Sequence, residues 1–303
     1  MYVNSISNLY PCNINNLSKR TSIPFSGLFA DIFTIKDKEA YNKKLAEKVL
    51  NKTDKVDLDF YNKTTTKERS IIPQTISGKM REVADYNFQV GVEFKKYLDK
   101  KYGKDKYVFV SIGTSPAGIG KVLQYMGAEV KFLPISALNA DDAYETLAKD
   151  EKGKRAYKKF LNEQGISTEN IKNSDKQYLF YDYAYRGITI KRFEEVLKNI
   201  FDVDTDLDNV HFIKLNDEIP SVQRNSLWLT RQVSDDYIDK YLRFPFVERY
   251  AGMPHLKYTE LDKINDVKNE KHDLETKKFI FEIIYKLDKK GLLKNNPLNE
   301  KNI

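Results

Sequence analysis

The stretch YLFYDYAYRGITI, Tyr178–Ile190, combines residue types that suit a phosphorylated sugar. Its apolar start predicts a strand that ends at Asp182. A short loop with Arg186 and Gly187 follows, and Thr189 falls in the first turn of the next predicted helix. A helix N-terminus offers unpaired N–H groups and the positive end of its dipole, so a turn of this kind can hold a phosphate. A carboxylate at the strand end reaches a sugar hydroxyl or a metal ion. We therefore expect a phosphate cradle here.

A second turn of small residues, SIGTSPAGIGK, lies about 70 residues upstream, at 111–121. It follows a predicted buried strand and precedes a helix, which suits a phosphate or pyrophosphate bound by backbone N–H groups. The P-loop pattern does not fit, because Ser115 occupies the position of its first glycine and Val122 follows the lysine. The Rossmann glycine spacing does not fit either. A tight connection without a ligand is the alternative at this turn.

Hydrophobic periodicity predicts α/β architecture around these two turns. The expected strands cover 106–112, 128–135, 178–182 and 209–215. The expected helices cover 37–51, 79–101, 121–126, 137–165, 189–200 and 274–290, and residues 52–73 read as a polar surface loop. Two strands joined by a short helix imply a right-handed parallel crossover, and the helix at 79–101 is expected to pack on the sheet.

No linker rich in Pro, Gly and Ser divides the chain, so we expect one α/β core at 79–220. An extended arm at 1–36 and a helix with a polar loop at 37–78 precede it. A helical extension at 221–303 follows and is expected to pack on the core. The first 30 residues contain no acid and lack the continuous apolar block of a secretory signal, although a targeting segment is left open.

Two small-residue loops after parallel strands, with a helical insert between them, resemble the type I phosphoribosyltransferase family over about residues 79–215. In that family an apolar strand leads to two acidic residues, two variable residues and a turn close to Thr-Thr/Ser-Gly-x-Thr. Here Asp182 matches the second acidic position. Gly187 matches the glycine and Thr189 the final threonine.

The resemblance implies a parallel sheet of phosphoribosyltransferase type with helical additions at both ends. It implies binding of a phosphorylated ribose ligand such as phosphoribosyl pyrophosphate, with transfer of the phosphoribosyl group, loss of pyrophosphate and Mg²⁺ as the cofactor. Asp182 would be the catalytic carboxylate and would hold the ribose hydroxyls. It is also the one side chain that could bind the metal. The implied binding residues are Gly113, Thr114 and Ser115 for pyrophosphate and Arg186, Gly187, Ile188 and Thr189 for the 5-phosphate. Lys121 is either a further candidate for contact with the pyrophosphate or a residue that faces solvent.

The sequence departs from the family pattern at two positions. Tyr181 occupies the first acidic position, which removes one acceptor for a ribose hydroxyl. Arg186 replaces a small hydroxyl residue and could neutralise a phosphate through two parallel hydrogen bonds. A catalytically inactive regulatory or interaction module is therefore the alternative function. An ordinary strand–helix crossover without a ligand is the structural alternative.

Composition limits the other classes of protein to which this chain could belong. Hydrophobic residues make up 41% and no apolar run approaches the roughly 20 residues of a membrane span, so we expect a cytoplasmic protein with no membrane partner. Lys and Arg exceed Asp and Glu by 51 − 44 = 7, which favours anionic ligands, but no basic run points to nucleic acid. Cys12 is the only cysteine, so no intrachain disulfide can form. The three histidines, His211, His255 and His272, lack metal-site spacing, and His211 is expected within a strand.

Several features leave alternatives open. The polar helices of 137–165 read either as solvated helices or as a cover over a site. The segment RFPFVERYAGMPH at 243–255 reads either as a surface that stacks on a base or as packing for the last helix. The sequence does not identify the acceptor of the phosphoribosyl group, and a homodimer is an open alternative.

Overall fold

The computed structural model describes residues 25–113, 116–138, 140–183, 188–215, 226–228, 256–268 and 271–294. The chain divides into two compact units, 1–41 and 42–303. In the first unit the described residues form the beginning of helix α1, Phe25–Leu50. Ile35 and Tyr41 on this part of the helix are exposed. The remaining elements belong to the second unit.

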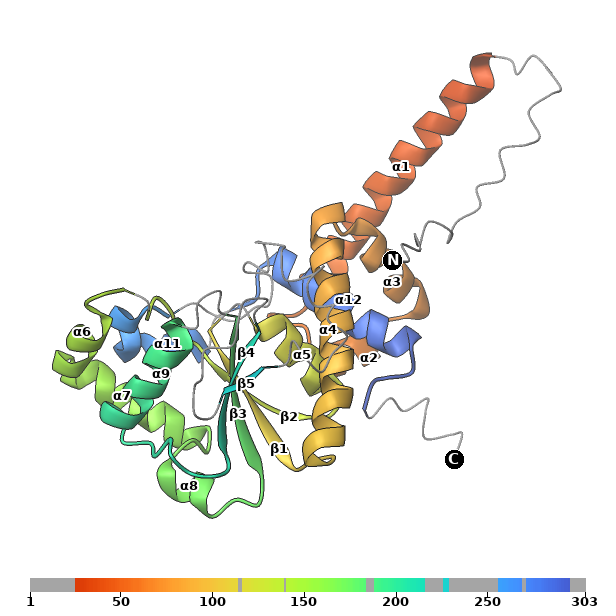
Figure 1. The fold of residues 1–303 in the computed structure, drawn as a ribbon. Helices are drawn as coiled ribbons and strands as arrows, with labels where there is room; N and C mark the ends of the chain where they lie inside the picture. Colours follow the sequence, from red (N-terminus) through yellow and green to blue (C-terminus); the bar gives the residue numbers. More distant parts are fainter. Residues whose placement is uncertain are drawn as a thin grey trace, which may run out of the picture. The chain divides into compact units, whose positions relative to one another are not determined.

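A sheet of five parallel strands forms the centre of the second unit (Figure 1). The strands are β1 (Tyr107–Ile112), β2 (Glu129–Leu133), β3 (Gln177–Tyr183), β4 (Val210–Leu215) and β5 (Ser226–Trp228), in the order β2-β1-β3-β4-β5. The four predicted strands and their parallel arrangement are confirmed, whereas β5 was not predicted. Every residue of β1 is buried, as expected of an inner strand covered on both faces.

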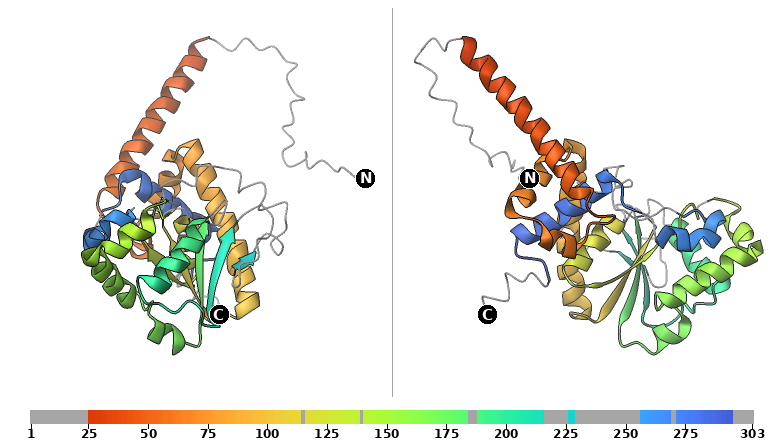
Figure 2. Two further views of the ribbon diagram at one scale, coloured as in Figure 1. Left: turned by 60° about the vertical axis from the view of Figure 1, so that its left-hand side comes forward. Right: turned by 180° about the vertical axis from the view of Figure 1, so that it is seen from behind.

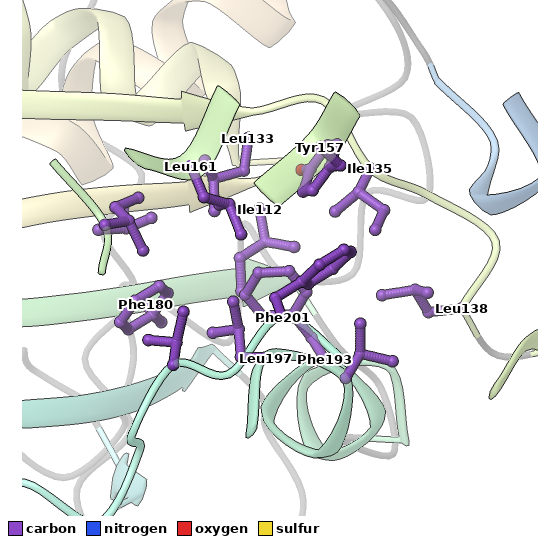
Figure 3. Packing of buried hydrophobic residues seen from close by; sticks show 14 of the residues in the cluster. Ile112, Leu133, Ile135, Leu138, Tyr157, Leu161, Phe180, Phe193, Leu197 and Phe201 are labelled. Atoms are coloured by element: carbon purple, nitrogen blue, oxygen red, sulfur yellow. The ribbon is translucent and has the colours of Figure 1, made fainter. Parts of the chain in front are cut away.

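Helices cover both faces of the sheet (Figures 1 and 2). On one face lie α4, Gly78–Tyr102, and α5, Ala117–Tyr125. On the other lie α7, Glu151–Glu163, and α9, Ile188–Asn199. Figure 3 shows the core on this second face, where side chains of β1, β2 and β3 meet those of α7 and α9. The α/β class and the packing of α4 on the sheet are therefore confirmed.

A further helical layer packs on the outer side of α4 and α5. Its central element is α12, Leu274–Lys289, which is joined by α2 (Leu58–Lys63), α3 (Thr66–Ile71), η1 (Ile72–Thr75) and the end of α1. The helix predicted at 274–290 is confirmed. All residues from Thr276 to Ile284 are buried, because other helices of this layer surround α12.

Residues 256–268 return to the loop that follows β2, where Ser136 forms a bridge with Lys257. Here η3, Tyr258–Lys263, and α11, Ile264–Lys268, lie beside α6, Ala143–Lys149, and α7. The Tyr258 hydroxyl donates to Asp142 at 2.9 Å. The short helix α8, Thr168–Lys172, precedes β3.

Several predicted boundaries were wrong. Residues 25–36 are helical in α1 instead of extended, and the predicted loop at 52–73 contains α2, α3 and the start of η1. Local caps explain the short helices: Asp57 caps α2, and Thr65 with Glu68 forms a capping box on α3. The helices predicted within 137–165 are confirmed as α6 and α7. The segment 243–255 lies outside the described residues.

Gly91 is required for the close approach of α4 to α5. A Cβ atom at Gly91 would lie 2.6 Å from both Cβ and Cγ1 of Val122. We expect Gly91→Ala to lower the free energy of unfolding by about 1–3 kcal/mol, measured by urea denaturation, because the two helices must move apart. Gly78, in the first turn of the same helix, has no atom within 4 Å of its Cβ position and provides the matched control. Equal midpoints for Gly91→Ala and Gly78→Ala would contradict this packing.

Candidate functional site

The two predicted loops leave adjacent strands at the same edge of the sheet. β1 and β3 pair directly, with Ser111 opposite Tyr181. The chain leaves β1 toward α5 on one face and leaves β3 toward α9 on the other. A reversal of this kind opens a crevice beyond the carboxyl ends of the strands, where ligands of open α/β sheets bind. The carboxyl ends of β1 and β3 therefore lie side by side at this point, which we call the β1/β3 edge.

The predicted site residues divide into those that the structure describes and those that it does not. Gly113, Asp182, Ile188 and Thr189 are described and belong to segments at the β1/β3 edge. Thr114, Ser115, Arg186 and Gly187 lie outside the described residues.

Gly113 shapes the turn after β1. Its φ of 69° lies in the left-handed region, which glycine adopts without a steric cost. Its N–H donates to the Leu133 carbonyl at 2.8 Å, and a Cβ atom would lie 3.0 Å from the Ile135 carbonyl oxygen. Because this N–H is already bonded, Gly113 would contribute to a pyrophosphate site through the path of the backbone and not through its own donor.

The first turn of α5 follows this loop and is deeply buried. Pro116 occupies the N-cap and supplies no side-chain hydrogen bond, while Ala117 and Ile119 are fully buried. The N–H groups of a first turn have no partner within their helix, so a buried and uncapped turn is suited to an acceptor from outside. This geometry fits the predicted pyrophosphate turn.

Two buried polar groups near this turn were missed in the sequence. Asn87 of α4 lies against Gly118, whose Cβ position is 2.4 Å from Asn87 Oδ1. Asn87 Nδ2 donates to the Val83 carbonyl at 2.8 Å. Neither Asn87 Oδ1 nor the hydroxyl of Ser111 on β1 has a hydrogen-bond partner in the described part of the chain. The sequence signal was an asparagine within the otherwise apolar face of the helix at 79–101.

Asp182 and Thr189 approach the edge from the other side. Asp182 is the next-to-last residue of β3 and is 7% exposed. It shares the strand face of Phe180, whose ring packs 6.1 Å from that of Phe193 on α9. Thr189 is half-buried in the first turn of the 12-residue helix α9. A carboxylate and a helix N-terminus therefore follow one another at the end of β3.

Arg192, one turn further along α9, was also missed. Its guanidinium donates to the carbonyls of Leu138 and Ala140 and lies 3.6 Å from Asp141. These contacts attach the loop after β2 to α9. Because the partners are more than 50 residues apart in the chain, no local pattern could have indicated them.

Tyr181 faces away from Asp182. It is fully buried on the α4 face of the sheet, with its ring 5.5 Å from that of Phe94 and 5.1 Å from that of Phe109. Successive strand residues point to opposite faces, so Tyr181 and Asp182 lie on different sides of β3. The residue at the first acidic position of the family pattern is thus a core residue in this chain.

Lys121 contacts the outer part of the sheet. Its ammonium lies 4.6 Å above the ring of Phe132 on β2 and donates to Gln124 Oε1 at 3.2 Å. Burial, with a smaller contribution from Lys55, lowers the pKa of Lys121 to about 8. Lys121 is half-buried, with its ammonium over the Phe132 ring.

His211 lies in β4, as predicted. Its Nε2 is 2.6 Å from Gln177 Oε1, and its ring stacks 5.8 Å from that of Tyr102. Burial lowers the pKa of His211. Among the residues that the structure describes, no group of three or more His, Cys, Asp or Glu side chains is arranged to hold a metal ion. No described helix is both long and apolar enough to cross a membrane.

Comparisons of this chain with models of protein families, with curated proteins and with solved structures found no match.

Proposed function

We propose that this chain is a phosphoribosyltransferase-like protein that binds a phosphorylated ribose ligand, such as phosphoribosyl pyrophosphate, at the β1/β3 edge. One observation carries the proposal. The two loops chosen from the sequence leave adjacent parallel strands and lead to helices on opposite faces of the sheet. That is the position at which α/β folds bind phosphorylated ligands.

Each part of the ligand has a chemical counterpart at this edge. The buried first turn of α5 suits the pyrophosphate, because its N–H groups point out of a helix N-terminus. The first turn of α9, with Thr189, suits the 5-phosphate. Asp182 provides an acceptor for the ribose hydroxyls between them.

Transfer would break the bond between the anomeric carbon of the ribose and a pyrophosphate oxygen, and would form a bond from that carbon to the acceptor. Positive charge develops on this carbon as pyrophosphate leaves, and a nearby carboxylate such as Asp182 stabilises it. Mg²⁺ is usually bound by one or two carboxylates together with substrate phosphates, so one buried carboxylate at the edge fits such an ion. When bound, Mg²⁺ would supply neutralisation of the pyrophosphate charge. The residues of this chain would orient the ribose and hold its phosphates.

The second candidate is a catalytically inactive module of the same fold that binds the ligand without turnover. Tyr181 favours the inactive module, because it occupies the first acidic position of the family pattern and is buried in the core. Asp182 is then the one carboxylate of this pair of positions that can contact the ribose. A regulatory or interaction role requires binding but does not require the departure of pyrophosphate.

Two measurements on the full chain separate these candidates. Calorimetry with phosphoribosyl pyrophosphate and Mg²⁺ measures binding, and a coupled assay measures pyrophosphate release across a panel of nucleobases. We expect saturable binding. Release with at least one base supports the transferase, and binding without release with any base supports the inactive module. If neither binding nor release is observed, both proposals fail.

A further inference from the structure

The loop that follows β2 contacts both halves of the proposed ligand site. We call residues 134–138 and 140–142 the β2 loop. Gly113, in the turn after β1, lies against the start of this loop, because its Cβ position is 3.0 Å from the Ile135 carbonyl oxygen. The Gly113 N–H also donates to the carbonyl of Leu133, the last residue of β2, at 2.8 Å. The turn assigned to pyrophosphate is therefore attached to β2 and to the β2 loop.

Arg192 attaches the other end of the β2 loop to α9. Its Nη1 donates to the Leu138 carbonyl at 3.3 Å and to the Ala140 carbonyl. The Asp141 carboxylate, 3.6 Å from Nη2, is fully exposed, so this ion pair contributes little and the two carbonyl bonds make the attachment. Arg192 lies three residues after Thr189, which places both residues on one face of α9. The helix assigned to the 5-phosphate is therefore also attached to the β2 loop.

Apolar side chains pack along the same contact (Figure 3). Ile135 and Leu138 of the β2 loop belong to one buried cluster with Phe193 and Leu197 of α9 and with Ile112, the last residue of β1. The β2 loop is thus held against α9 by packing as well as by Arg192.

The backbone of the β2 loop adopts a conformation that needs support from its surroundings. Ala137 has a φ of 60°, in the left-handed region that residues other than glycine rarely adopt. The Ala140 N–H donates to the Ala137 carbonyl at 3.1 Å and closes a turn. Such a conformation persists only where neighbouring contacts determine it. The contacts of the β2 loop therefore hold it in one position.

Residues 256–263 provide further contacts of this kind. The Ser136 hydroxyl donates to the Leu256 carbonyl at 3.1 Å, and the Tyr258 N–H donates to the Ser136 carbonyl at 3.3 Å. The Tyr258 hydroxyl donates to Asp142 Oδ1 at 2.9 Å. The β2 loop is therefore held both by α9 and by a segment more than 100 residues further along the chain.

We propose that Arg192 is a positioning residue, which fixes the β2 loop and thereby sets the spacing between the two phosphate-binding turns. This inference rests on the proposed function. The pairing of β1 with β3 fixes the strand ends, whereas the β2 loop fixes the segments that leave them. A ligand with phosphate groups at both ends, such as phosphoribosyl pyrophosphate, occupies both turns at once only while their spacing is kept. A fragment that occupies one turn does not depend on that spacing.

The test compares three ligands by calorimetry on the full chain with Mg²⁺: phosphoribosyl pyrophosphate, ribose 5-phosphate and pyrophosphate. Arg192→Met removes both bonds to the β2 loop. We expect the affinity for phosphoribosyl pyrophosphate to fall by about 10- to 100-fold, and the affinities for the two fragments to stay within about twofold of the wild type. Weakening of ribose 5-phosphate by the same factor would indicate a direct contact with the 5-phosphate and would overturn the positioning role.

A second variant reaches the β2 loop without altering Arg192. Tyr258→Phe removes the hydrogen bond to Asp142, and we expect the same selective loss for phosphoribosyl pyrophosphate, by about tenfold. Lys191→Met is the control for charge, because it removes a cation from an exposed position next to Arg192. It should leave all three affinities unchanged, and a loss equal to that of Arg192→Met would contradict the proposal. The urea midpoint shows whether each variant is folded.

The positioning role and the proposed function fail in different ways. If the wild-type chain and the folded variants Arg192→Met and Tyr258→Phe bind phosphoribosyl pyrophosphate equally well, the positioning role is wrong and the proposed function stands. If the wild-type chain binds none of the three ligands, the proposed function fails, and the positioning role fails with it.

Discussion

Asp182→Asn is expected to weaken the binding of phosphoribosyl pyrophosphate by about 10- to 100-fold. An amide keeps the shape of the carboxyl group but loses its charge and one of its acceptor oxygens, and a hydrogen bond to a charged group contributes about 1.5–3 kcal/mol. Asp182 is buried at the end of β3. We therefore do not expect the asparagine side chain of the variant to turn toward water instead. Calorimetry in the presence of Mg²⁺ measures the change.

The matched control for this substitution is Asp208→Asn, which removes a carboxylate from an exposed position before β4. It should leave the affinity unchanged. The urea midpoint of each variant shows whether the fold is intact. Equal affinities of the wild-type chain and a folded Asp182→Asn variant would remove Asp182 from the ribose site.

Tyr181→Asp is expected to destabilise the fold and not to restore an acidic pair at the ribose. The substitution places a carboxylate between Phe94 and Phe109 in the core and removes a fully buried ring. An unpaired buried charge and the loss of a large core side chain each cost about 3–5 kcal/mol. Urea denaturation should therefore show a much lower midpoint or an unfolded chain.

Tyr181→Phe is the control, because it keeps the ring contacts with Phe94 and Phe109. Its stability should lie within about 1.5 kcal/mol of the wild type. If Tyr181→Asp kept the wild-type midpoint, the residue would not face the core, and the assignment of the two strand faces at the end of β3 would be wrong.

The sheet and its main helices were predictable because their patterns are local. Alternating or continuous apolar residues indicated β1 to β4, and the apolar stripe of α4 indicated both its length and its contact with the sheet. The three-residue strand β5 has too few residues for a pattern. The short helices α2 and α3 depend on caps within a polar stretch, which resembles a surface loop when only composition is considered.

The candidate site was predictable only in part, because its assembly depends on strand order. The sequence indicated that each loop follows a strand, but it did not indicate that β1 and β3 are neighbours. Asn87 and Arg192 reach their positions through contacts between distant segments.

A crystal structure of the chain with phosphoribosyl pyrophosphate and Mg²⁺ tests the central claim most directly. We expect the ligand at the β1/β3 edge, with its ribose hydroxyls at Asp182, its 5-phosphate at the first turn of α9 and its pyrophosphate at the first turn of α5. A ligand bound only elsewhere on the chain, or a β1/β3 edge without ligand at saturating concentration, would contradict the account.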